Sequence, residues 1–198
     1  IKKYRKKFLN FLEKKKLNKT KLHPVEVKID GIKSFEMIYK DKNLKKIVRG
    51  FFKGRVGSDF LRIVKKDHKN FSSVFCHQDT GYQIGSFDRY SLFISLTDNN
   101  HLNGGMIVYP STHKFGYLGD AGEISQKITK KYHKICPNLK AGDILVMHSS
   151  LWHESNKNFK KIHRIYLELH IQHIDETKTK YNIIARRKRI INTLFQTA

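Results

Sequence analysis

Three residues in the middle of the sequence have the types and spacing to bind one metal ion. His77 and Asp79 are two residues apart, so in an extended segment both side chains project to the same side. His153 follows a predicted strand at 143–148 and supplies a third ligand from elsewhere in the chain. Two neutral imidazoles and one carboxylate on one face of an octahedral ion form the ligand set of non-haem Fe(II) oxygenases, with three positions open for cosubstrate and O2. For the His-x-Asp pattern alone, a structural histidine hydrogen-bonded to a nearby aspartate is the alternative.

The segment from His77 to Arg164 carries four sequence blocks that make this hypothesis more specific. They are His77-Gln78-Asp79, then Asn103-Gly104-Gly105-Met106 leading to Pro110-Ser111-Thr112-His113-Lys114, then Ala141-Gly142-Asp143-Ile144-Leu145, and finally His153-x-Ser155-x-x-Asn158 with Arg164. In this order the blocks resemble the phytanoyl-CoA dioxygenase-like family of Fe(II)/2-oxoglutarate oxygenases. The first 70 residues show no matching motif.

The resemblance implies that His77, Asp79 and His153 bind iron, and that Arg164 binds the far carboxylate of 2-oxoglutarate. A guanidinium suits that role because it presents two parallel donors to a carboxylate and is always charged. The alternative is an ordinary strand arginine that pairs with Glu168, four residues later.

Two more residues are implied to take part. Ser155 lies two residues after His153, on the same side if the segment is extended, and is implied to help hold the same carboxylate. Gln78 is implied to contact cosubstrate or substrate, although its side chain should face away from its two neighbours. Asp79 favours hydroxylation over halogenation, because related halogenases replace this carboxylate by a small residue so that halide can bind iron.

The implied reaction is the hydroxylation of a C–H bond of a small-molecule metabolite, with Fe(II), 2-oxoglutarate and O2 as cofactors and succinate and CO2 as products. Three alternatives stay open: a nucleic-acid-directed oxygenase, a non-catalytic basic nucleic-acid-binding protein, and a degenerate jelly roll that binds metal without turnover. Against the first, DNA-repair oxygenases usually carry a second arginine six residues after the cosubstrate arginine, where this sequence has His170.

The elements that must position these residues change type along the chain. Apolar residues at steps of three and four predict helices over residues 1–11 and 44–52. Strict alternation at 90–97 and 164–172 is typical of strands, and short apolar runs between Gly, Asn and Asp turns favour a jelly roll. The apolar spacing from Ile183 to Phe195 fits a closing helix.

We therefore expect a mainly β protein with flanking helices, a cupin-like double-stranded β-helix (jelly roll) in a single oxygenase domain, 1–198. Residues 1–70 are expected to be mostly helical support and to form a lid, residues 71–175 the jelly-roll core, and residues 176–198 a C-terminal helix.

Composition limits the class of protein. The chain has 198 residues and a formal net charge of +23, and no apolar run reaches the roughly 20 residues that span a bilayer. Only two cysteines are present, which favours a reducing compartment, and we expect a cytoplasmic protein without a membrane partner. Residues 77–123 are mildly acidic, so we expect no specific nucleic-acid partner and a small substrate, with one anionic group steered by peripheral lysines. The oligomeric state is left open.

Overall fold

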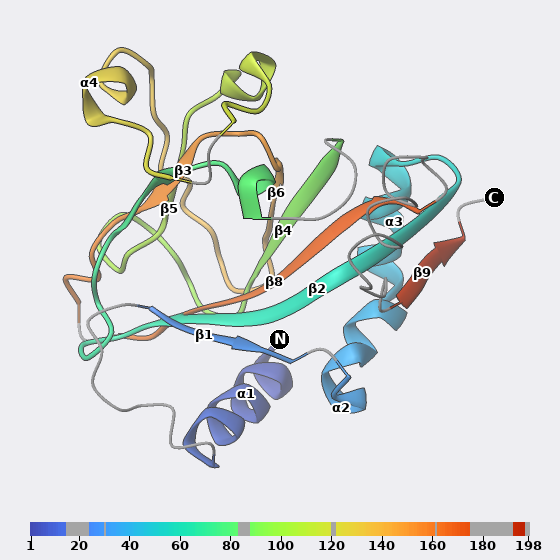
Figure 1. The fold of residues 1–198 in the computed structure, drawn as a ribbon. Coiled ribbons are helices and arrows are strands. Elements are labelled where there is room, and N and C mark those ends of the chain that lie inside the picture. Colours follow the sequence, from blue (N-terminus) through green and yellow to red (C-terminus); the bar gives the residue numbers. More distant parts are fainter. Residues whose placement is uncertain are drawn as a thin grey trace.

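The computed structural model describes residues 1–14, 24–29, 31–82, 88–119, 122–160, 162–174 and 192–196. Two sheets face each other in this part of the chain, and helices pack against the outer face of the larger sheet (Figure 1). None of the described helices is long and apolar enough to cross a membrane. The helical elements are α1 (Lys2–Lys14), α2 (Lys33–Glu36), α3 (Lys42–Phe51), α4 (Gln126–Thr129) and the 3-10 turns η1 (Met37–Lys40), η2 (Asp79–Tyr82) and η3 (Thr112–Phe115).

The strands form two antiparallel sheets. Their bounds are β1 (Val25–Lys28), β2 (Arg55–Lys66), β3 (Val74–His77), β4 (Arg89–Ser95), β5 (Met106–Val108), β6 (Ile144–His148), β7 (His153–Ser155), β8 (Arg164–His173) and β9 (Asn192–Gln196). The larger sheet has the order β1-β2-β8-β4-β6, with β9 also paired to β2, and the smaller sheet has the order β3-β7-β5. Two facing sheets of this kind confirm the predicted jelly-roll architecture.

Strand β8 is buried on both faces and links the two cores. Leu167 and Leu169 pack against the helices, in a cluster with Phe8 of α1 and Val48 of α3. Tyr166 points the other way, toward the smaller sheet, because successive strand residues face opposite sides. The polar residues that share the Tyr166 side of β8 therefore face the space between the sheets.

The predicted N-terminal helices are confirmed as α1 and α3. Asp41 begins α3 with a helix cap, because its Oδ1 accepts a hydrogen bond from the Leu44 backbone N–H at 2.9 Å. The segment 1–70 nevertheless also contains β1 and the 12-residue strand β2, so strands of the larger sheet begin before residue 71. Strand β2 was not predicted, because Gly57, Ser58 and Asp59 interrupt its apolar residues as a turn would.

The prediction of a C-terminal helix is wrong for residues 192–196. Asn192–Gln196 forms β9, which pairs with Arg55–Ser58 of β2. Strand β1 pairs only with Arg62–Lys65, so the backbone N–H and C=O groups at the other end of this edge of β2 are open to a further strand. The rest of the predicted helix, residues 176–191, lies outside the described residues.

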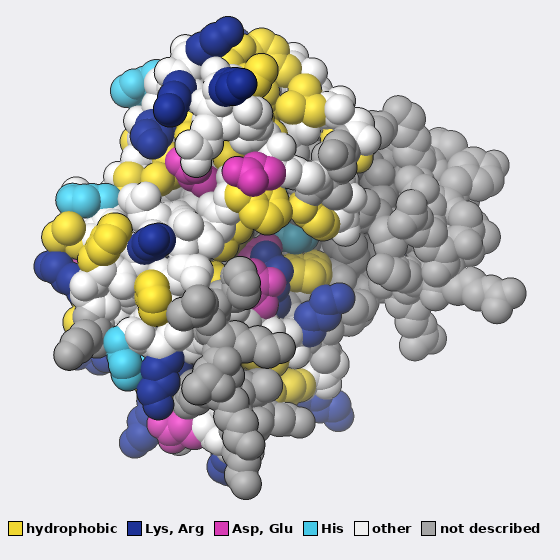
Figure 2. Space-filling model, turned by 60° about the vertical axis from the view of Figure 1, so that its left-hand side comes forward, with side chains coloured by type: hydrophobic (Ala, Val, Ile, Leu, Met, Phe, Trp, Pro, Cys, Tyr) yellow, Lys and Arg dark blue, Asp and Glu magenta, His cyan; other side chains and the backbone are white. Residues whose placement is uncertain are grey.

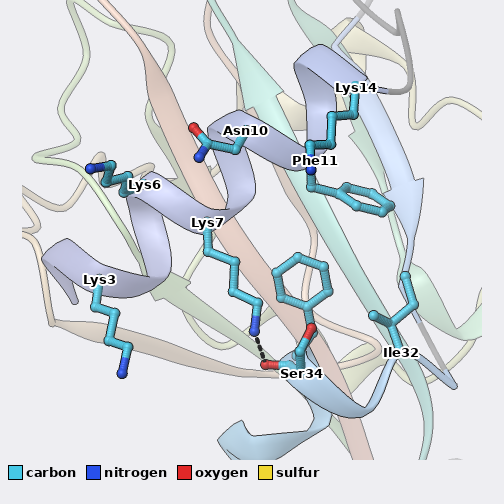
Figure 3. Close-up of a pocket in the computed structure, with 9 residues that line it drawn as sticks. Lys3, Lys6, Lys7, Asn10, Phe11, Lys14, Ile32 and Ser34 are labelled. Atoms are coloured by element: carbon cyan, nitrogen blue, oxygen red, sulfur yellow. Dashed lines mark hydrogen bonds between the residues drawn. The ribbon is translucent and has the colours of Figure 1, made fainter.

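Part of the positive charge lies on α1, away from the space between the sheets. Lys3, Lys6 and Lys14 are exposed around a groove whose wall includes Phe11 (Figure 3). Lys7 is partly buried, and its Nζ donates a hydrogen bond to the Ser34 carbonyl at 2.6 Å. Lys3, Lys6 and Lys14 are therefore among the peripheral lysines that the composition leads us to expect.

Candidate functional site

The three predicted metal ligands come together between the two sheets. His77 ends β3 and His153 begins β7, and these residues are direct partners in the smaller sheet, with ring centroids 4.3 Å apart. Asp79 begins η2, and its Oδ1 lies 3.7 Å from Nε2 of His77 and 3.5 Å from Nε2 of His153. Ligand atoms about 2.0–2.2 Å from one metal ion are less than about 4.4 Å apart. The three side chains therefore have the spacing that one ion requires.

Both histidine rings are oriented by their own backbone. Nδ1 of His77 lies 2.8 Å from the Phe75 carbonyl, and Nδ1 of His153 lies 2.9 Å from the Leu151 carbonyl. A carbonyl only accepts, so in the neutral form of each ring Nδ1 carries the proton and Nε2 keeps a free lone pair. Hydrogen bonds of this kind fix the tautomer and ring orientation of metal-binding histidines.

The electrostatics of the site favour a neutral His77 and an ionised Asp79. Burial, with a smaller effect of His153, lowers the pKa of His77 to about 4. Burial alone would raise the pKa of Asp79, but the nearby His153 imidazole outweighs it and holds this pKa well below its usual range. For His153, burial lowers the pKa, and the contact with Asp79 raises it above its usual value. A neutral imidazole and a carboxylate are both ready to bind a cation.

A second polar group lies beside Asp79. Ser91 donates to Oδ2 of Asp79 at 2.6 Å, and one ligand atom each of Asp79, Glu168 and His170 lies within 4.8 Å of the others. Nε2 of His170 lies 2.7 Å from Oε1 of Glu168. Sequence reasoning missed Glu168 and His170 as site residues, although both share the inward face of β8 with Arg164 at even spacing.

Arg164 lies in the same cavity as the triad and is 2% exposed. Its guanidinium carbon lies 4.7 Å from the centre of the Tyr166 ring, and its Nε has no hydrogen-bond partner among the described residues. Glu168 pairs instead with Arg62, whose Nε donates to its Oε2 at 2.6 Å. The structure thus does not support the alternative in which Glu168 pairs with Arg164.

Lys66 is a second buried basic residue beside Arg164, and sequence reasoning missed it. The two residues are direct partners in β2 and β8. Nζ of Lys66 donates to Oγ of Ser155 at 2.7 Å and to the Asn156 carbonyl at 2.6 Å. Burial, with the nearby Arg164, lowers the pKa of Lys66 to about 6. The many other lysines of the chain gave no signal to single it out.

Gly104 makes room for this lysine. Its backbone has a φ of +81°, and a Cβ there would lie 2.9 Å from Cδ of Lys66. The conformation agrees with the turn expected for the Asn103-Gly104-Gly105-Met106 block.

Of the two further predicted site residues, Ser155 lies at the cavity and Gln78 does not. Ser155 lines the cavity and contacts Lys66, as a residue two positions after His153 should if β7 is extended. Gln78 is buried outside the residues that line this cavity. Its Nε2 donates to the Gly116 and Ser150 carbonyls, both at 2.7 Å, and its Oε1 accepts from the Leu118 N–H at 3.0 Å. The structure therefore brings together five of the six predicted site residues and leaves Gln78 among loop backbone.

The donor set fits both an iron ion and 2-oxoglutarate. Two imidazoles and one carboxylate suit a divalent iron with open positions. The buried Arg164 guanidinium, with the Lys66 amine beside it, suits the carboxylates of a small dianion, because an uncompensated buried charge is costly.

The fold is similar to that of two proteins that were solved with 2-oxoglutarate, also called alpha ketoglutarate. One is SnoN, an alpha ketoglutarate dependent epimerase from nogalamycin biosynthesis, which was solved with Fe3+, alpha ketoglutarate and a nogalamycin compound. SnoN is 15% identical to this chain, and the two structures align with a TM-score of 0.63 over 75% of this chain and 62% of SnoN. Another is EctD from S. alaskensis, solved with 2-oxoglutarate and 5-hydroxyectoine; it is 19% identical, with a TM-score of 0.56 over 66% of this chain and 48% of EctD.

Sequence comparison gives the family. A phytanoyl-CoA dioxygenase of Arabidopsis thaliana is 30% identical over 125 residues, which are 58% of this chain and 44% of the plant protein. The chain thus matches less than half the length of this relative. The family model of phytanoyl-CoA dioxygenase (PhyH) matches residues 3–164. The chain belongs to the phytanoyl-CoA dioxygenase family.

Proposed function

We propose that this protein is an Fe(II)- and 2-oxoglutarate-dependent oxygenase that hydroxylates a C–H bond of a small-molecule metabolite. The observation that carries the proposal is a single cavity lined by His77, His153, Ser155 and Arg164. A metal-binding triad and a buried cationic pocket are the two sites that such an enzyme needs, and here they adjoin.

Each residue has a defined task in this proposal. His77, Asp79 and His153 hold the iron, which when bound couples O2 and 2-oxoglutarate to the oxidation of the substrate. Arg164 and Lys66 hold the far carboxylate of 2-oxoglutarate, and Ser155 orients Lys66 through its hydroxyl. Ser91 keeps Asp79 in place by donating to its second oxygen. Tyr166, Val64 and Phe93 pack beside these groups and limit the access of water.

The substrate is proposed to be a small molecule. The peripheral lysines led to the expectation of an anionic substrate, but three glutamates line the cavity itself. A nucleic-acid-directed oxygenase remains the competing proposal, since overall charge alone supports it.

The test is a screen of metabolites with protein, Fe(II), 2-oxoglutarate and O2, read by succinate release and by a mass gain of one oxygen in a metabolite. We expect both signals together, and we expect neither with Asp79→Ala. If a protein that binds Fe(II) and 2-oxoglutarate releases no succinate with any compound, it is the degenerate jelly roll.

A further inference from the structure

Three glutamates line the cavity beside the triad, together with two arginines. They are Glu26, Glu154 and Glu168, with Arg62 and Arg164. On the face of the molecule that Figure 2 shows, acidic, basic and histidine side chains gather in a hollow near the centre. Since Arg164 is assigned to 2-oxoglutarate, the other four residues decide which charge a substrate meets.

Arg62 is already engaged by two carboxylates. Its Nε and Nη2 donate to Glu168 at 2.6 Å and 3.1 Å, and its Nη1 donates to Oε2 of Glu26. The donors of this one guanidinium are thus shared between two carboxylates. Arg62 is therefore a poor partner for a substrate anion.

The accessible end of this chain of charges is Glu26. Its side chain is 45% exposed, compared with 24% for Arg62 and 0% for Glu168. Glu154 is engaged elsewhere, because its Oε1 accepts from the Tyr109 hydroxyl at 2.9 Å and lies 3.8 Å from Nζ of Lys134. Glu26 is thus the carboxylate most open to a molecule entering the cavity.

We propose that Glu26 binds a positively charged group of the substrate, and that the substrate is an amine or a quaternary ammonium compound. This inference rests on the proposed function, because it gives the substrate class of the same site. Arg62 acts as a positioning residue that holds the Glu26 carboxylate toward the cavity and links it to Glu168.

Aromatic side chains near His77 support the same class of ligand. Phe75 and Tyr82 are 45% and 57% exposed, and their ring centroids lie 5.5 Å and 5.9 Å from that of His77. Exposed aromatic faces bind ammonium groups through cation–π attraction. Neither ring is among the residues that line the cavity with Glu26, but both lie beside His77, which does line it.

The test uses choline, its neutral carbon isostere dimethylbutanol, and the anion dimethylbutanoate as probes. The protein is loaded with Mn(II) and 2-oxoglutarate, and paramagnetic broadening of the probe's methyl NMR signals reports binding near the metal. We expect choline to be broadened more than its two isosteres. Glu26→Gln should weaken choline binding about fivefold, the change that corresponds to about 1 kcal/mol. Glu26→Lys should shift the preference to dimethylbutanoate.

The matched control is Glu13→Gln, which changes an exposed glutamate of α1 and should leave choline binding unchanged. Equal broadening of the three probes, no broadening by choline, or full choline affinity in Glu26→Gln would overturn the inference. In each of these cases Mn(II) and 2-oxoglutarate still bind, so the proposed function stands. If the wild-type protein fails to bind Mn(II) and 2-oxoglutarate, the proposed function and the inference about Glu26 are both overturned.

Discussion

Lys66 and Arg164 face each other across strands β2 and β8, and both side chains are buried. Direct partners in an antiparallel pair project to the same face of the sheet. Burial, together with repulsion by the nearby Arg164 guanidinium, lowers the pKa of Lys66 to about 6, so its amine is mostly neutral at pH 8 without a ligand. A carboxylate bound beside both groups would raise this pKa and favour a protonated Lys66, so the pair is better satisfied with a bound dicarboxylate than without one.

The first prediction concerns Arg164. Arg164→Ala should raise the KM for 2-oxoglutarate by a factor of at least about 30, because loss of one partner of a buried charge pair costs about 2–5 kcal/mol. Metal affinity, measured by Mn(II) titration, should change little, and Arg164→Lys should recover part of the loss. An unchanged KM would place the cosubstrate carboxylate elsewhere.

The second prediction is a pH dependence of 2-oxoglutarate binding that originates at Lys66. Without ligand its pKa is about 6, so the amine is mostly neutral at pH 8. A bound carboxylate raises this pKa, so binding takes up a proton, and the affinity should fall as the pH rises from about 6 to 8, by at most about tenfold per unit. Calorimetry in buffers of different ionisation enthalpy measures the uptake.

Lys66→Met is the variant that isolates this effect, and Lys46→Met, an exposed lysine of α3, is its control. The first should bind 2-oxoglutarate weakly and with little pH dependence, and the second should behave like the wild type. A wild-type affinity that does not change over this range, or that increases with pH, contradicts the assignment.

The third prediction concerns the support that α1 gives to the larger sheet. Phe8 is 0% exposed and stacks on Phe35 with ring centroids 4.5 Å apart. Phe8→Ala should lower the free energy of unfolding by about 3–5 kcal/mol, whereas the exposed Lys6→Ala should change it little. Urea denaturation measures both, and a loss below about 1 kcal/mol for Phe8→Ala would show that α1 contributes little to the core.

Much of the site was predictable from the sequence because its signals are local. The His77 and Asp79 spacing, the distal His153 and Ser155 two residues later all depend on short-range geometry. Lys66 was not predictable, since its role depends on the pairing of β2 with β8, which joins segments about a hundred residues apart. Glu26 was not predictable either, since its position depends on the pairing of β1 with β2. Strand β9 was missed for the same reason, because an open edge of β2 outweighs a local apolar spacing that fits a helix.

The fourth prediction separates the small-molecule proposal from its nucleic-acid competitor. Binding to random-sequence oligonucleotides should be weak and should fall steeply with salt, because counterion release is its main driving force. Replacing Lys3, Lys6 and Lys14 by Ser should reduce the salt slope, by about 0.9 for each lost contact with a duplex phosphate. Binding that survives about 0.2 M salt, or a gain of one oxygen on a nucleobase, would favour the nucleic-acid-directed oxygenase.

The central claim is that His77, Asp79 and His153 bind one catalytic iron beside a 2-oxoglutarate pocket. An anaerobic Fe(II) titration of the wild type, His77→Ala and His153→Ala, followed by 2-oxoglutarate and monitored by visible absorption, tests it most directly. We predict one Fe(II) per wild-type chain, a new charge-transfer absorption on addition of 2-oxoglutarate, and the loss of both in each variant. Full iron content and the same absorption in both variants would contradict the account.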